Sequence, residues 1–195
     1  MVPVTDFLPT LRMLVDVPVP GLMETAIVKA AQKFCRESKV LVRERQYAEV
    51  YSCQLVSVVS NQVGPKGKVQ LKGAGIISVS SKGQRLEAGH DYSVVGLDKV
   101  KFNADFMDVK ITGIAEPLVN ATQLPAELLN DYCDGICAGA ASILQLQPTT
   151  AWFNPELASF NQREYVQSIR DAYRYTIENT PALEEPQLVR RREFY

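Results

Sequence analysis

Residues 124–179 have the sequence LPAELLNDYCDGICAGAASILQLQPTTAWFNPELASFNQREYVQSIRDAYRYTIEN. This stretch holds two sets of apolar residues at the three-and-four spacing of amphipathic helices, joined by a short turn at 147–154. It contains no arrangement of reactive side chains. The pattern therefore predicts an antiparallel helical hairpin that serves packing and assembly.

The first helix of the hairpin is expected to begin at Pro125, because proline is preorganised for the first helical position. Gly135 and Gly139 lie four residues apart beside its apolar stripe, and each costs about 1 kcal/mol relative to alanine in a helix interior. That cost favours a close approach by another helix, although glycines tolerated at a loosely packed site are the alternative. The expected stripe is Leu128, Leu129, Tyr132, Cys133, Ile136, Cys137, Ala140, Ala141 and Leu144.

The second helix of the hairpin follows Asn154 and Pro155, which are a capping residue and a first-turn proline. Its expected buried stripe is Leu157, Ala158, Tyr165, Ile169, Ala172, Tyr173 and Ile177. After Pro181 the apolar pattern stops, since prolines and charged residues leave little to bury. The sequence predicts an extended tail over 181–195, which either has no partner or becomes ordered on one.

The N-terminal region is also predicted to be helical. A short helix over 5–15 is followed by a Pro-rich break at 16–21 and a longer helix that ends near Lys39. The longer helix has apolar residues at helical spacing, namely Leu22, Met23, Ala26, Ile27, Ala30, Ala31 and Phe34. One of its faces is therefore expected to pack against the rest of the protein.

Between 40 and 116 the apolar period changes from helical spacing to two. The alternating residues are Tyr51, Cys53 and Leu55, then Val69 and Leu71, Val100 and Phe102, and Val109 and Ile111. Gly-containing turns separate these runs. The chain is thus predicted to be an α+β protein with a helical bundle from 1–39 and 117–180, an inserted antiparallel β domain or small sandwich at 40–116, and the tail at 181–195.

Composition limits the classes of function. The formal net charge of −1 argues against the basic surface that non-specific nucleic-acid binding requires. The four cysteines lie in predicted helices and strands, so we expect them to be reduced and buried. No apolar run approaches the roughly 20 residues of a spanning helix, and the N-terminus lacks the pattern of a signal peptide. We expect a protein that works in a cytoplasm or in a particle assembled there, without membrane contact.

The sequence offers no convincing catalytic or metal site. His90 is the only histidine and lies in a turn-like stretch, where a surface or turn role is favoured. Cys133 and Cys137 have a spacing that suits two metal ligands, but no second pair completes the set. Asp131 and Asp134 are three apart on the predicted helix and are expected to be solvated neighbours. We therefore expect no enzyme activity, no cofactor and no metal.

Several segments together resemble the head-to-tail adaptor (connector) proteins of tailed bacteriophages. They are TDFLP at 5–9, the Pro-rich break at 16–21, AAQKFCRES at 30–38, and WFNPELA at 152–158 after a Gly-Ala helix. The resemblance covers both helical regions, somewhat under half of the chain. The β region matches only in its position and its turn-rich character, and its length is a departure from a minimal adaptor.

The resemblance implies a structural virion protein at the neck, assembled in the host cytoplasm. Copies of such proteins form a ring, typically of twelve, which docks on the portal protein, extends the DNA channel and presents a surface to a tail or neck protein. DNA then passes through without specific binding. Carried over to this chain, Gly135, Gly139, Trp152 and Tyr165 would serve helix packing or oligomer contacts. The portal-binding residues would be Arg190, Arg191, Arg192, Phe194 and Tyr195.

Two alternatives remain open at the level of sequence. The chain is either another ring-forming neck or tail component, such as a tail terminator or collar protein, or a module that binds a ligand on its β domain. The second alternative requires an exposed aromatic cluster on one sheet face. The residues available for it are Tyr47, Tyr51, Tyr92, Phe102 and Phe106.

Overall fold

The computed structural model describes residues 1–59 and 70–180. Its helical elements are the 3-10 helix η1 (Val4–Phe7) and the α-helices α1 (Leu8–Leu14), α2 (Pro20–Ser38), α3 (Ala126–Gln145) and α4 (Pro155–Asn179). Its strands are β1 (Val2–Pro3), β2 (Val42–Val50), β3 (Leu55–Ser57), β4 (Leu71–Ser81), β5 (Gln84–Arg85), β6 (Tyr92–Val95), β7 (Lys99–Phe102), β8 (Phe106–Pro117) and β9 (Gln123–Leu124). The predicted α+β class is confirmed.

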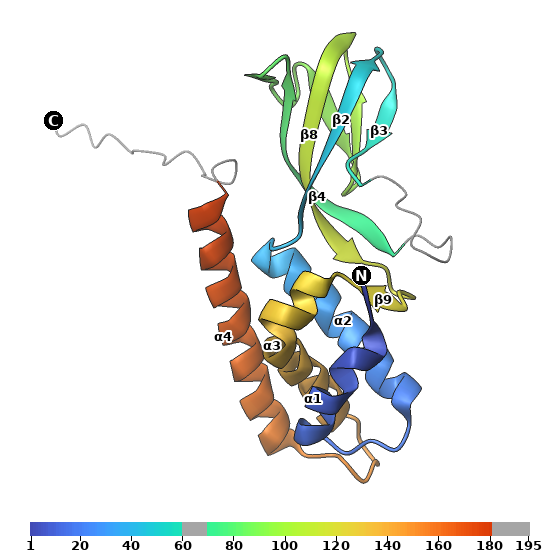
Figure 1. Ribbon diagram of the computed structural model, residues 1–195, viewed down its shortest axis with the longest axis vertical. Coiled ribbons are helices and arrows are strands. Elements are labelled where there is room, and N and C mark those ends of the chain that lie inside the picture. The colour runs from blue at the N-terminus through green and yellow to red at the C-terminus, as the bar shows by residue number, and fades with distance from the viewer. Residues whose placement is uncertain (60–69, 181–195) are drawn as a thin grey trace, which may run out of the picture.

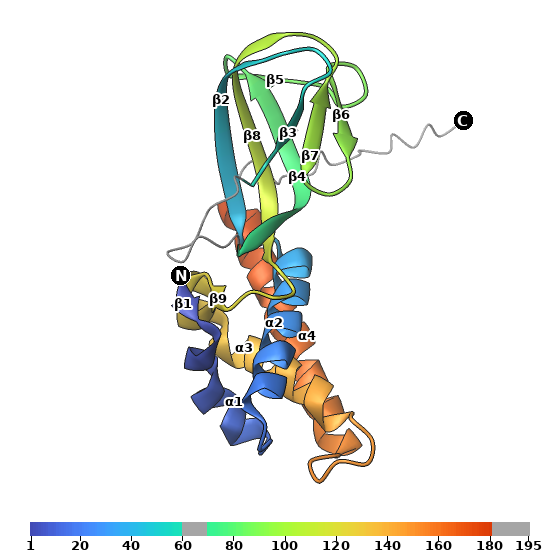
Figure 2. The same cartoon turned by 90° about the vertical axis from the view of Figure 1, so that its right-hand side faces the viewer.

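The strands form antiparallel sheets in the orders β2-β8-β4-β5, β3-β7-β6 and β1-β9. The two larger sheets lie together at one end of the helical bundle, and β4 and β8 run down to the bundle (Figure 1). The view turned by 90° shows the same arrangement, with β1 and β9 beside the helices (Figure 2). The pairing of Val2 with Leu124 joins the N-terminus to the residues just before α3, and it was not predicted.

The helix boundaries follow local chemistry. The Asn154 side chain accepts a hydrogen bond from the backbone N–H of Leu157 at 3.0 Å, which confirms the predicted cap of α4. Pro125 precedes α3, which begins one residue later than predicted. At Tyr132 the backbone of α3 leaves helical geometry, with φ of −133° and ψ of 16°, so this helix is kinked in a way that the periodicity does not reveal.

Two clusters of buried apolar side chains hold the structure together. The larger one fills the helical bundle and includes Val59, Leu71 and Ala115 from the base of the β region. The smaller one lies between the two larger sheets, as in a small sandwich. It consists of Val50, Val56, Val58, Val79, Tyr92, Val100, Phe102, Val109 and Ile111. The sheets therefore have a core of their own, while their lower ends share the core of the bundle.

The predicted alternation of Tyr51, Cys53 and Leu55 is wrong. The chain turns at this point, with a hydrogen bond from the Gln54 N–H to the Tyr51 carbonyl at 3.0 Å and a positive φ of 65° at Cys53. The turn changes which residues face inward, so Tyr51 and Leu55 are exposed and their neighbours Val50 and Val56 are buried.

The expectation that all four cysteines are buried is also wrong. Cys35 and Cys137 are buried, but Cys133 is only half-buried and Cys53 is exposed. Cys53 is exposed because it lies in the turn between β2 and β3, where the strand alternation does not apply.

A buried carboxylate joins the β region to the bundle. The side chain of Glu116 on β8 is fully buried, and its oxygens accept hydrogen bonds from Arg36 Nε at 2.8 Å and Arg36 Nη2 at 2.7 Å. Lys72 Nζ of β4 lies 3.0 Å from the same carboxylate. Burial raises the pKa of Glu116, but its hydrogen bonds and the positive charges of Arg36 and Lys72 outweigh burial and bring the pKa below its ordinary value. The pairing thus fixes α2, β4 and β8 to one another.

Candidate assembly surface

The glycines of α3 allow α4 to pack closely against it. A Cβ atom at Gly135 would overlap the side chain of Ser168, and one at Gly139 would lie 2.6 Å from Cδ2 of the Tyr165 ring. Both neighbours belong to α4. The close approach by another helix that the sequence suggested is therefore made within the subunit, and any larger residue at Gly139 must displace the ring.

Tyr165 and Trp152 also pack within the subunit. The Tyr165 ring is buried, and its hydroxyl donates a hydrogen bond to the Ala30 carbonyl of α2 at 2.7 Å. Burial raises the pKa of Tyr165 far above its ordinary value, so the phenol stays protonated and can donate this bond. Trp152 is half-buried against the bundle core, and its indole N–H has no hydrogen-bond partner among the described residues. The structure thus places the four predicted packing residues in the bundle, while their role between copies stays a proposal.

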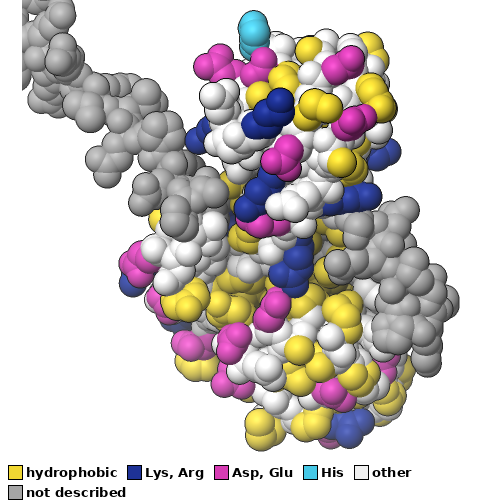
Figure 3. Space-filling model, turned by 45° about the horizontal axis from the view of Figure 1, so that its top comes forward, with side chains coloured by type: hydrophobic (Ala, Val, Ile, Leu, Met, Phe, Trp, Pro, Cys, Tyr) yellow, Lys and Arg dark blue, Asp and Glu magenta, His cyan; other side chains and the backbone are white. Residues whose placement is uncertain are grey.

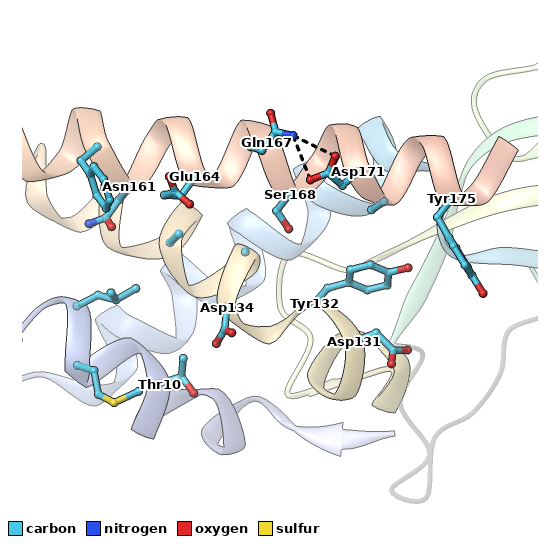
Figure 4. A pocket seen from close by; sticks show the side chains of 16 residues that line it. Thr10, Asp131, Tyr132, Asp134, Asn161, Glu164, Gln167, Ser168, Asp171 and Tyr175 are labelled. Atoms are coloured by element: carbon cyan, nitrogen blue, oxygen red, sulfur yellow. Dashed lines mark hydrogen bonds between the residues drawn. The ribbon is translucent and has the colours of Figure 1, made fainter. Parts of the chain in front are cut away.

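A groove of about 840 Å³ lies between α1, α3 and α4. Asp131, Asp134, Glu164 and Asp171 are among its lining residues, and Figure 4 shows how their side chains are arranged on α3 and α4. Asp131 and Asp134 both line this groove, and the backbone between them leaves helical geometry at Tyr132. Among the described residues that line it there is no Lys or Arg. The groove therefore presents several negative charges over a short length of helix.

Apolar side chains accompany these charges. Met13, Phe160 and Tyr175 line the groove with exposed fractions of 79%, 51% and 62%. Methionine and aromatic side chains with this exposure are typical of binding surfaces, because their burial against a partner removes a large apolar area from water. The groove thus combines an apolar lining with an acidic one.

A second exposed apolar region lies at the turn between α3 and α4, and we call it the hairpin end. It consists of the exposed residues Ile143, Leu146, Phe153 and Leu157. In the space-filling view, hydrophobic side chains are also prominent over the helical part of the molecule (Figure 3). Exposed apolar side chains that lie close together in sequence at the end of a helical hairpin are candidates for a protein interface.

The prediction that Leu157 belongs to the buried stripe of α4 is wrong. The buried residues of α4 are Ala158, Asn161, Tyr165, Ile169, Ala172 and Thr176. Two of these are polar and satisfied: Asn161 Nδ2 donates to Gln145 Oε1 at 2.9 Å, and Thr176 Oγ1 donates to the Ala172 carbonyl at 2.8 Å. Leu157 lies outside this inward face and is exposed. Leu157 is offset by one residue, or about 100° around the helix, from Ala158, and this offset from the rest of the stripe was the signal that could have identified the hairpin end.

The predicted portal-binding residues lie outside the described residues. They are Arg190, Arg191, Arg192, Phe194 and Tyr195. Their charge and aromatic character are known from the sequence alone.

The groups considered for chemistry have other roles in the structure. His90 is exposed in a turn, where its Nδ1 lies 2.9 Å from Asp91 Oδ1, and this hydrogen bond and charge raise its pKa. The Sγ atoms of Cys133 and Cys137 lie 4.0 Å apart, and burial raises the pKa of the Cys137 thiol, which favours a neutral packing role. Residues 1–59 and 70–180 contain no group of three or more His, Cys, Asp or Glu side chains arranged to hold a metal ion.

The aromatic residues of the β region do not form an exposed face. Tyr92 and Phe102 are buried, while Tyr47 and Phe106 pack against the same cluster and are half-buried. The ring centroids of Phe102 and Phe106 are 5.8 Å apart, as in a packed aromatic pair. Only Tyr51 of the five is exposed. These residues therefore give no support to a β domain that binds a ligand on an aromatic platform.

The groove and the hairpin end together form what we call the assembly surface. In the part of the chain that the structure describes, no helix is both long enough and apolar enough to cross a membrane. No protein-family model matches the chain, and no curated protein matches it.

Proposed function

We propose that the chain is a head-to-tail adaptor of tailed bacteriophages. In this role it is a structural protein without catalytic activity, and its copies form a ring beneath the portal at the neck of the virion. The ring extends the DNA channel and provides the surface to which a tail or neck protein attaches. The resemblance of 5–9, 16–21, 30–38 and 152–158 to this family is the starting point of the proposal.

The observation that carries the proposal is the exposure of apolar side chains on the helices that bear the resemblance. Phe153 and Leu157 lie within the WFNPELA segment itself and are 47% and 49% exposed. Side chains of this size cost free energy in water, and a large exposed cluster is expected to be covered by a partner. A subunit that functions within a larger assembly accounts for this exposure.

A ring of this kind requires two different interfaces on each copy. In such a head-to-tail ring, one surface of each copy binds a different surface of the next copy. The hairpin end is our candidate for one of them. By analogy with the family, the ring holds twelve copies. The net charge of −1 is compatible with a channel through which DNA slides without binding strongly.

The C-terminal segment is the proposed binding site for the portal protein. Residues 190–195 combine three arginines with two aromatic residues, and both kinds of side chain are frequent in the energetically dominant positions of interfaces. In the proposed role this segment binds the portal protein. In a tail terminator or collar protein, residues 190–195 would instead bind the tail tube of the virion. Whether this C-terminal segment binds the portal or the tail tube therefore distinguishes the two candidates.

Deletion of residues 187–195 should abolish the attachment of tails while the folded domain persists. None of these residues belongs to the described bundle or sheets, so the far-UV circular dichroism spectrum and a cooperative thermal transition should be retained. Electron microscopy of lysates from the genome with this deletion should show DNA-filled heads without tails.

The matched control is the double replacement Glu184→Ala and Glu185→Ala, which alters the tail outside 187–195. It should yield infectious, tailed particles. Normal tailed particles from the deletion itself would contradict the proposed role of the tail. Complete particles from a genome that lacks the whole reading frame would contradict the adaptor function.

A further inference from the structure

The acidic and apolar groove has the features of a peptide-binding site without an assigned occupant. Asp131, Asp134, Glu164 and Asp171 are all exposed, and none of them forms an ion pair with a described residue. Among the described residues, the carboxylate of Asp171 accepts hydrogen bonds only from the neutral Gln167 amide, at 3.0 and 3.1 Å. Four carboxylates without cations repel one another, and a bound cationic segment relieves that repulsion.

We propose that this groove binds residues 187–195 of the same chain while the subunit is free. The segment has the sequence QLVRRREFY. Its three consecutive arginines supply the positive charge that would balance the carboxylates of the groove. The guanidinium group of arginine also forms paired hydrogen bonds with carboxylates. Its flanking apolar residues, Leu188, Val189, Phe194 and Tyr195, match the exposed Met13, Phe160 and Tyr175 of the groove.

The length of the chain permits this contact. α4 ends at Asn179, and Tyr175 lines the groove near that end, while Phe160 lies farther back along the same helix. Phe160 lies nineteen residues before Asn179, which corresponds to about 28 Å of helix. The ten residues 180–189 can span up to about 33 Å. Arg190 can therefore reach the carboxylates of Glu164 and Asp171 on α4 of its own subunit, and Asp131 and Asp134 line the same groove.

Tethering favours the groove of the same subunit over that of another copy. A short linker gives its two ends an effective concentration in the millimolar range when its length matches the span. A free subunit at micromolar concentration offers neighbouring grooves at far lower concentration. Its own tail therefore occupies the groove first.

Occupancy of the groove has a consequence for assembly, and this consequence rests on the proposed function. If the arginines and aromatic residues bind the portal in the particle, then the groove competes with the portal for the same segment. In a free subunit, residues 187–195 would occupy the groove and would not be available to other partners. The portal would bind this segment only if its affinity for the segment exceeds that of the groove. Binding in the groove itself does not depend on that role.

Photo-crosslinking of the full chain tests the inference. Phe194→p-benzoyl-phenylalanine places a photoreactive ring in the tail, and illumination at micromolar protein concentration should link residue 194 to a segment that lines the groove, with Met13 a favoured target. The product should migrate as a monomer on a denaturing gel, and mass spectrometry should identify the linked peptides.

Charge variants show whether the acidic lining is responsible. Asp134→Lys with Asp171→Lys should reduce the yield of this crosslink to about one tenth, because two exposed ion pairs together are worth up to about a decade in affinity. Glu178→Lys, also exposed on α4 but outside the groove, should leave the yield unchanged. Replacement of Arg190, Arg191 and Arg192 by Glu should reduce the yield similarly, without altering the described bundle.

Three results would overturn the inference. They are the absence of a crosslink, a crosslink to residues outside the groove, and crosslinked dimers in place of monomers. A yield that neither set of charge variants changes would also overturn it. None of these results bears on the adaptor role, which depends on the particles that form when the reading frame is absent.

Discussion

Arg36→Met is expected to lower the free energy of unfolding by about 3 kcal/mol at neutral pH. The carboxylate of Glu116 is fully buried, and Arg36 supplies two of the three short contacts to it. Removal of the arginine leaves a buried negative charge, for which Lys72 is the one remaining cation among residues 1–59 and 70–180. Chemical denaturation followed by circular dichroism measures the loss.

Glu116→Gln, which removes the carboxylate, should lower the free energy of unfolding less than Arg36→Met, which removes the arginine. The side chains of Arg36 and Lys72 are 54% and 38% exposed, so water can solvate both cations when Glu116→Gln takes away their partner. In Arg36→Met the group left behind has no access to solvent. The double variant Arg36→Met with Glu116→Gln should therefore be more stable than Arg36→Met alone.

The loss should depend on pH in a defined direction. In the native protein the pKa of Glu116 lies below its ordinary value of 4.5, so its contribution is fully present above that value and is lost as pH falls through the lower, folded value. In Arg36→Met the effect of burial dominates and raises the pKa of Glu116 in the folded protein. The ionised carboxylate therefore lowers the free energy of unfolding of the variant above that raised pKa, and this loss is absent below about pH 4.5. The difference in stability between the two proteins should shrink as the pH falls from 7 to 4.

Lys110→Met is the matched control. Lys110 lies on the same strand β8 and pairs with Glu44 at 2.8 Å, but the two side chains are 42% and 53% exposed. Its replacement should cost less than about 1 kcal/mol and show little dependence on pH. Equal losses for Arg36→Met and Lys110→Met would show that the buried carboxylate does not fasten the β region to the bundle.

The helical hairpin could be predicted from the sequence because its signals are local. The cap at Asn154, the apolar stripe of α3 and the small residues at 135 and 139 are each visible in a short stretch of sequence, whereas the residues that the two glycines contact, Ser168 and Tyr165, lie on α4. Leu157 was placed wrongly because the prediction relied on local signals alone. A buried Asn161 has no apolar signature, and its hydrogen-bond partner Gln145 lies on another helix. Periodicity detects helices well and misses polar residues that are satisfied in the core.

The remaining features depend on contacts between residues far apart in the sequence. Arg36 and Glu116 are 80 residues apart, and Val2 pairs with Leu124 across most of the chain. The groove combines α1 with α3 and α4, so its acidic and apolar lining exists only after the bundle has packed. Such pairings have no local pattern from which they can be predicted.

Gly139→Leu is expected to destabilise the subunit by at least about 3 kcal/mol. Even a single Cβ at this position would lie 2.6 to 2.9 Å from three atoms of the Tyr165 ring. The ring cannot turn away at low cost, because its hydroxyl is bonded to the Ala30 carbonyl and would lose that partner inside the core. α4 must then separate from α3, and thermal unfolding should show a lower midpoint. His90→Ala, at an exposed turn, should leave the midpoint unchanged.

The alanine variant separates this steric effect from helix propensity. Alanine favours a helix over glycine by about 1 kcal/mol, so Gly139→Ala should stabilise the protein if nothing opposes the new methyl group. The structure predicts the opposite sign, since the methyl group meets the Tyr165 ring. In a Tyr165→Ala background the ring is gone, and Gly139→Ala should become neutral or stabilising, which gives a coupling energy of at least about 1 kcal/mol. Additive effects of the two replacements would show that α3 and α4 do not meet at this contact, and the hairpin on which the assembly surface is built would have to be packed differently.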